Sequence, residues 1–169
     1  MKYIIAFTLI LASINSYCQL ERTYNQAGYS IHYPQNWTID TSRRMADAIF
    51  FFSPLENAKD SFSENVNIMA QDLTGKNINL TAYKDLTEKQ ISTMAVNGRL
   101  IKSVIEQTPG GERYYVEYQM TMNSNDLHIK SICYIKKNTA YLATFTAKTD
   151  SFDKYNGTGT EILKTFKVK

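Results

Sequence analysis

The chain has 169 residues, a formal net charge of +3 and 12% aromatic residues. Its 19 lysines and arginines are scattered among 16 acidic residues, which excludes the one-sided basic surface of a nucleic-acid-binding protein. Its two histidines and two cysteines show no zinc-ligand spacing.

The first eighteen residues have the pattern of a secretory signal peptide. Residues 3–14 form an apolar run that is too short to span a bilayer, and residues 16–18 provide a cleavage site. We therefore predict export to the periplasm or the medium, with residues 19–169 as a single mature domain that has no transmembrane helix. The alternative is a lipoprotein anchored through Cys18, although the residues just before it fit that pattern poorly.

The first predicted strand covers residues 29–33, where polar and apolar side chains alternate, and it stops at Pro34, which cannot donate to a ladder. Trp37 follows in a turn, and we expect its ring to pack on the sheet edge. The apolar run 48–52 predicts a strand that is buried on both faces and closed by Pro54.

Polar segments surround these strands and predict irregular connections. Residues 20–26 form a lead-in, and residues 38–47 form a connection that carries Arg43 and Arg44. Residues 55–64 form a loop with three acidic residues, Glu56, Asp60 and Glu64. Their oxygens could bind Ca²⁺, but no EF-hand spacing is present, so a solvated loop is the alternative.

The next stretch combines alternating and helical periods. Residues 65–72 alternate and predict a strand. Residues 80–95 carry apolar side chains at helical spacing, with Asn79 or Thr81 to cap the start and Asn97-Gly98 to end the helix. Residues 99–107 predict another strand.

The clearest pattern runs from Glu112 to Lys148 and predicts three consecutive strands. The turns between them fall in residues 123–126 and at Lys137-Asn138, because Asn and Asp tolerate left-handed backbone. Cys133 falls among apolar neighbours, which predicts a buried, inert thiol.

Two tyrosines in these strands, Tyr115 and Tyr134, lie outside the main apolar register. We interpret them as candidates for a contact surface or for packing under a helix. A final helix is predicted to begin at Asp150 or Ser151, and its Phe166 should pack on the sheet. Gly157 and Gly159 weaken its middle, so we expect a break there.

The order of elements predicts an α+β fold, because strands joined by hairpins are antiparallel neighbours and two helices must cover them. Segments 28–37, 52–54 and 64–68 resemble the opening of a PsbP-like domain, and segments 141–147 and 152–167 resemble its close. The resemblance implies the Mog1/PsbP-like fold, an α/β/α sandwich with a mainly antiparallel six- to seven-stranded sheet and helices on both faces.

The resemblance also implies a binding or accessory role. Such domains serve as extrinsic subunits of photosystem II, bind a small GTPase or chaperone transmembrane segments of secreted effectors, and none is established as catalytic. The partner expected here is another envelope or secreted protein. The alternative is a carrier or chaperone that binds an apolar ligand or a hydrophobic segment.

We predict no enzyme activity and no cofactor, because His32 and His128 stand apart as surface or edge residues with no catalytic or metal-binding pattern around them. The candidate interaction residues are Tyr115, Tyr134, Arg43 and Arg44. The residues predicted to be structural are Trp37, Pro34, Phe52, Pro54 and Phe166.

Overall fold

The structure is a computed structural model that describes residues 20–43 and 48–169. The predicted signal peptide and its Cys18 lie outside these residues, as does Arg44. The elements are β1 (Arg22–Asn25), β2 (Tyr29–Tyr33), β3 (Thr38–Asp40), β4 (Ile49–Phe52), β5 (Asn65–Asp72), α1 (Leu80–Thr93), β6 (Arg99–Thr108), β7 (Gly111–Met122), β8 (Asn125–Lys136), β9 (Thr139–Lys148), α2 (Phe152–Lys164) and β10 (Lys167–Val168).

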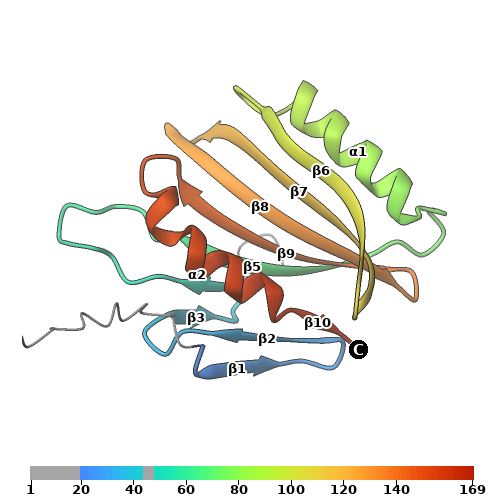
Figure 1. Cartoon of the computed structure of the whole chain (residues 1–169), viewed down its shortest axis with the longest axis horizontal. Helices are drawn as coiled ribbons and strands as arrows, with labels where there is room; N and C mark the ends of the chain where they lie inside the picture. The colour runs from blue at the N-terminus through green and yellow to red at the C-terminus, as the bar shows by residue number, and fades with distance from the viewer. Residues whose placement is uncertain (1–19, 44–47) are drawn as a thin grey trace, which may run out of the picture.

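A seven-stranded sheet forms the centre, in the order β3-β4-β5-β9-β8-β7-β6 (Figure 1). Every neighbouring pair is antiparallel. The β7–β8 turn has left-handed backbone at Asn123 and Ser124, and the β8–β9 turn has it at Lys137 and Asn138. These tight turns confirm the predicted hairpins.

The two helices cover opposite faces of this sheet, as neighbouring residues of β8 show. Cys133 belongs to the cluster that receives Ile91 of α1, whereas Ile132 belongs to the cluster that receives Ile162 of α2. Successive strand residues point to opposite faces. The helices therefore form the outer layers, which confirms the predicted α+β sandwich (Figure 1).

A second, three-stranded sheet has the order β1-β2-β10 and does not follow from the sequence pattern. The predicted lead-in of residues 20–26 is instead partly a strand, because Arg22–Asn25 pairs with β2. The chain end returns to the same strand, where Lys167 lies opposite Ser30. The predicted connection of residues 38–47 likewise begins with a strand, since Thr38–Asp40 forms the edge strand β3. These strands are short and largely polar, so they carry no apolar alternation.

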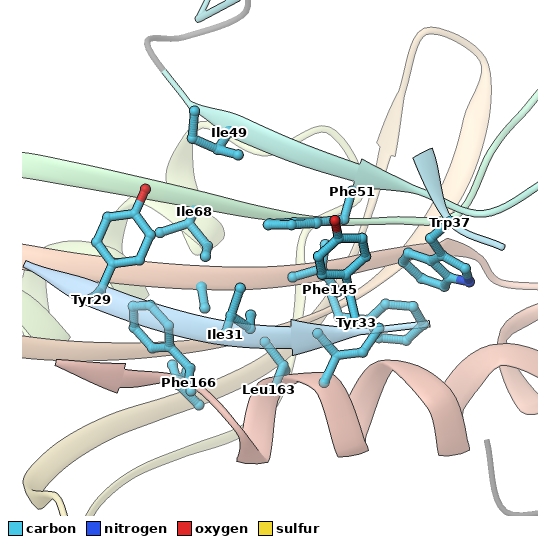
Figure 2. Packing of buried hydrophobic residues seen from close by; sticks show 14 of the residues in the cluster. Tyr29, Ile31, Tyr33, Trp37, Ile49, Phe51, Ile68, Phe145, Leu163 and Phe166 are labelled. Atoms are coloured by element: carbon cyan, nitrogen blue, oxygen red, sulfur yellow. The ribbon is translucent and has the colours of Figure 1, made fainter. Parts of the chain in front are cut away.

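The main core lies between the sheet, α2 and β2 (Figure 2). Trp37 is at one end of the cluster, and Tyr29 and Phe166 are toward the other. The expectation that residues 48–52 are buried on both faces is wrong. Phe51 is fully buried, but Phe50 and Phe52 are half-buried and stack on each other with ring centroids 5.4 Å apart.

The helix ends differ from the prediction at three points. Asn79 caps α1 as expected by accepting a hydrogen bond from the Ala82 N–H at 2.9 Å, but the helix ends at Thr93. Asn97 rather than Gly98 adopts left-handed backbone after it. The expected break in the last helix is wrong, because α2 continues from Phe152 to Lys164. Among the described residues, neither helix is long and apolar enough to cross a membrane.

Cys133 is 1% exposed, and burial raises the pKa of its thiol to about 12. Since only the thiolate reacts, a chain of residues 19–169 should not react with Ellman's reagent at pH 8 while it is folded. It should react with one equivalent after denaturation. Stoichiometric reaction of the native protein within minutes would contradict this burial.

Candidate interaction surface

Part of the α2-side sheet face extends beyond the helix. α2 packs against β5, β8 and β9, and against β2 of the small sheet, while β6 and β7 continue past it. We call the exposed and half-exposed side chains of this region the open face: Lys102, Val104, Glu106, Arg113, Tyr115 and Glu117. Register places them on one side, because Lys102 lies opposite Glu117, Val104 opposite Tyr115 and Glu106 opposite Arg113.

A hydrogen-bond network fixes the part of the open face around Tyr115 and Glu117. The Tyr115 hydroxyl donates to Glu117 Oε2 at 2.7 Å, and His128 Nε2 lies 2.8 Å from Glu117 Oε1. Arg99 donates to Gln119 Oε1 at 2.7 Å, and Gln119 Nε2 then faces His128 Nδ1 at 3.4 Å. Nε2 is therefore the ring nitrogen that donates to Glu117.

His128 also joins the open face to α2. Its ring stacks on Phe152 with centroids 3.5 Å apart and planes 3° apart. Lys130 reaches the same helix and donates to Asn156 Oδ1 and Thr160 Oγ1. The expectation that His128 is a surface or edge residue is wrong, because its side chain is only 12% exposed.

Charged contacts hold the part of the open face around Lys102, Glu106 and Arg113. Arg113 pairs with Glu106 at 2.6 Å, and the Lys102 ammonium lies 5.2 Å from the centroid of the Tyr115 ring. Burial and the hydrogen bond to Glu117 raise the pKa of Tyr115, so the hydroxyl stays protonated. The aromatic and charged groups are thus fixed before any partner binds.

Glu117 should make the stability of the protein depend on pH in the acid range. Burial raises its pKa, but hydrogen bonds from Tyr115 and His128 and the charge of Lys130 outweigh that effect and hold the pKa below the ordinary 4.5. A carboxylate with a lowered pKa stabilises the fold above its unfolded-state pKa, and this stability is lost as pH falls through the folded value.

Replacing Glu117 with glutamine should therefore lower the free energy of unfolding by about 1–3 kcal/mol at pH 7. The difference from the wild type should shrink as the pH falls below about 4.5, because the unfolded state then binds a proton at Glu117, and it should be lost once the pH passes the lowered pKa of the folded carboxylate. Urea titrations of both proteins between pH 7 and pH 3 measure it. A difference that stays constant over this range would contradict the network.

The sequence candidates occupy different places. Tyr115 lies in the open face, but Tyr134 is only 8% exposed and packs on Phe166 with ring centroids 6.2 Å apart. Arg43 follows β3 in left-handed backbone, away from the open face in sequence and sheet order. Arg44 lies outside the described residues.

The residues predicted to be structural also divide by exposure. Trp37 and Phe166 are 4% and 3% exposed, and the Pro34 carbonyl accepts the Trp37 N–H at 3.1 Å. Phe52 is half-buried and Pro54 is exposed.

The three acidic residues of loop 55–64 line one depression of about 580 Å³ together with lysines. Glu56 pairs with Lys154 at 2.7 Å, and Asp60 accepts the Glu56 N–H at 2.9 Å. Glu64 is not solvated as expected: it is 3% exposed and accepts the Ser151 hydroxyl at 2.6 Å. Among residues 20–43 and 48–169, no group of three or more His, Cys, Asp or Glu residues could hold a metal ion.

Ser151 occupies the cap position of α2, but its side chain does not cap the helix. Its hydroxyl is directed to Glu64 instead, and Ser53 Oγ lies 3.4 Å from the other carboxylate oxygen. These contacts join the end of loop 55–64 to the start of α2. The oxygens of this loop therefore already have protein partners, which supports a structural role for Glu64.

Solved structures with this fold come from several bacteria. Cyanobacterial PsbP (CyanoP) of Synechocystis sp. PCC 6803 is 17% identical with a TM-score of 0.67, and the match covers 94% of this chain and 99% of that chain. LpqN of Mycobacterium tuberculosis, described as involved in cell envelope biogenesis, is 11% identical with a TM-score of 0.59. The match covers 88% of this chain and 91% of that chain. PA94 of Pseudomonas aeruginosa, a protein of unknown function, is 13% identical with a TM-score of 0.56, and the match covers 80% of this chain and 88% of that chain.

At these identities the likeness shows the shared fold. No curated protein matches the chain. The PsbP family model matches residues 21–168, which includes every strand and helix described above. The chain therefore belongs to the PsbP family.

Proposed function

We propose that this protein is an exported, non-catalytic accessory protein that binds another envelope or secreted protein through the open face. Membership of the PsbP family supports an accessory role. LpqN, which shares the fold, is described as involved in cell envelope biogenesis, and this supports a site of action in the envelope. The mature protein would be the single domain of residues 19–169.

The observation that carries the proposal is the fixed arrangement of Tyr115 and Arg113 on a sheet face that α2 leaves open. Tyrosine and arginine are enriched among the residues that dominate binding energy at protein interfaces. Because these side chains are already ordered, a partner loses less conformational entropy on binding them. β6 lies at the edge of the seven-stranded sheet, so its outer backbone groups can pair with an added strand.

The same contacts argue against catalysis. Both ring nitrogens of His128 face neighbours within the protein, and its ring is stacked on Phe152. Both Glu117 oxygens are bonded to protein groups as well. Cys133, the only cysteine among the described residues, has a raised pKa and is buried. General acid–base and covalent catalysis need such groups within reach of a substrate.

Site-specific photocrosslinking tests the proposed surface. A benzophenone side chain introduced at Val104 should capture one partner reproducibly in native envelope fractions. The same group at Leu86, which is 48% exposed on α1, is the matched control and should not capture it. In the protein that carries the benzophenone at position 104, replacing Tyr115 with alanine should reduce the crosslinking yield about tenfold or more. Loss of a central interface tyrosine costs at least about 1–2 kcal/mol of binding free energy.

Equal capture from both positions, or a yield that is insensitive to Tyr115 in a folded variant, would overturn the open face as the binding surface. Turnover in an unbiased substrate screen that disappears in a folded His128→Ala variant would overturn the non-catalytic assignment.

Export has its own test. Intact-mass measurement of the protein from envelope fractions should show a chain that begins at Gln19, because the apolar run and the small residues that follow it fit signal-peptide cleavage. A chain that begins at a diacylglycerol-modified Cys18 would make the protein a lipoprotein instead.

A further inference from the structure

A cavity of about 520 Å³ lies between the β6–β7 turn and the segment that joins α2 to β10. We call it the C-terminal pocket. It is lined by Thr108, Pro109, Gly110, Arg113, Tyr134, Lys164, Phe166, Lys167 and Val168. Its volume is within the range of small-molecule binding sites, roughly 300–1,000 Å³.

The wall of the C-terminal pocket is apolar. Tyr134 and Phe166 pack together in it, and Pro109 and Val168 complete it. Both aromatic rings belong to the main core, so their positions are fixed by the fold rather than by a ligand. A ligand that fills this pocket would need an apolar body.

The rim of the C-terminal pocket carries positive charge. Arg113, Lys164 and Lys167 line it, and no acidic residue of segments 20–43 and 48–169 does. Arg113 is held by Glu106 at 2.6 Å, whereas Lys167 has no acidic partner among the described residues. The pair between Lys164 and Glu161 is exposed, and such pairs contribute little, so Lys164 can turn toward a ligand.

The depression beside loop 55–64 gives a useful contrast. It is of similar size, about 580 Å³, but its lining mixes acids with lysines, and Glu56 already pairs with Lys154. The C-terminal pocket thus combines an apolar wall with a cationic rim, and the depression beside loop 55–64 does not.

We propose that the C-terminal pocket binds a small anionic molecule with an apolar body, such as an aromatic or aliphatic carboxylate or sulfonate. The anionic group would lie among Arg113, Lys164 and Lys167, where charge-assisted hydrogen bonds form. The apolar body would cover Tyr134 and Phe166. This site shares Arg113 with the open face, but its apolar wall and its two lysines lie outside the open face.

Gly110 provides a way to block the pocket. A Cβ atom there would lie 3.6 Å from both Thr108 Oγ1 and the Tyr134 hydroxyl, which is ordinary van der Waals contact. Left-handed backbone is found at Gly111 and not at Gly110. Gly110→Leu should therefore fold and direct its side chain toward the pocket. Gly157→Leu is the matched control, because a Cβ atom at Gly157 meets no atom within 4 Å.

The test uses two probes that differ only in a charged group. They are 8-anilinonaphthalene-1-sulfonate and its neutral analogue N-phenyl-1-naphthylamine, titrated into the mature protein by fluorescence and calorimetry. We expect one sulfonate probe per chain, bound on the order of tenfold more tightly than the neutral probe, as one charge-assisted contact would give. Gly110→Leu should weaken both probes at least tenfold, and Gly157→Leu should weaken neither.

The double variant Lys164→Gln/Lys167→Gln should weaken the sulfonate probe and leave the neutral probe unchanged. This variant alters exposed side chains, so it keeps the test informative if Gly110→Leu fails to fold. Equal affinity for the two probes, or binding that survives in folded Gly110→Leu, would overturn the proposal. Photocrosslinking from Val104 should persist in Gly110→Leu, which separates failure of this site from failure of the open face.

Discussion

Replacing Trp37 with alanine should lower the free energy of unfolding by roughly 3–5 kcal/mol, the range for large-to-small changes at buried aromatic residues. The indole is 4% exposed and belongs to the main core with Tyr33 and Phe51 (Figure 2). Its position is set by a tight turn, in which the Trp37 N–H donates to the Pro34 carbonyl at 3.1 Å. The loss should therefore include both the transfer of the ring from water and the cavity that remains.

Urea denaturation followed by circular dichroism measures this loss, since Trp37 is the only tryptophan and its fluorescence disappears with the substitution. Trp37→Phe should cost less, because a ring remains in the cavity. Leu55→Ala is the exposed control, at 52% exposure, and should change stability by no more than about 0.5 kcal/mol. An unchanged midpoint in Trp37→Ala would show that the indole is not part of the core.

The sequence predicts the long strands well because the alternation of apolar and polar side chains follows which side chains are buried. Residues 112–148 alternate, and asparagines mark their turns, so β7, β8 and β9 follow from periodicity alone. β1, β3 and β10 could not be predicted this way. They are two to four residues long and mostly exposed or half-buried, and they form through pairing with β2 or β4 rather than through their own pattern.

The open face was only partly predictable. Tyr115 stands out because it falls off the apolar register, but Glu117 and His128 look like ordinary polar residues of two strands. One signal was available: a two-residue turn at Asn123-Ser124 fixes the β7–β8 register. That register places Gln119 opposite His128, and Glu117 one diagonal step away, within reach of a long side chain.

The burial of Glu64 could not be predicted from the sequence. It follows a run of polar residues and reads as part of a solvated loop, yet the fold buries it against Ser151, 87 positions along the chain. A buried carboxylate needs hydrogen-bond donors, and no local pattern reveals that the partner comes from the start of α2. The contact exists only because β5 and β9 pair and bring the two segments together.

The same substitution at two glycines of α2 should have opposite effects on stability. A Cβ atom at Gly157 meets nothing within 4 Å, so Gly157→Ala should raise the free energy of unfolding by about 0.5–1 kcal/mol through helix propensity. A Cβ atom at Gly159 would lie 2.5 Å from the Phe145 ring, which is fully buried. Gly159→Ala should therefore lower it by about 1–3 kcal/mol, the usual cost of overpacking.

Close approach of α2 to the sheet is the physical reason, so the cost at Gly159 should depend on Phe145. In a Phe145→Leu background, the smaller side chain leaves room for the added methyl group, and the cost of Gly159→Ala should fall. A double-mutant cycle by urea denaturation measures this coupling, which we expect to be on the order of 1 kcal/mol. If both alanines stabilised the wild type equally, Gly159 would be only a weak point in the helix. A clear cost that disappears in the Phe145→Leu background would show that this glycine lets α2 lie against the sheet.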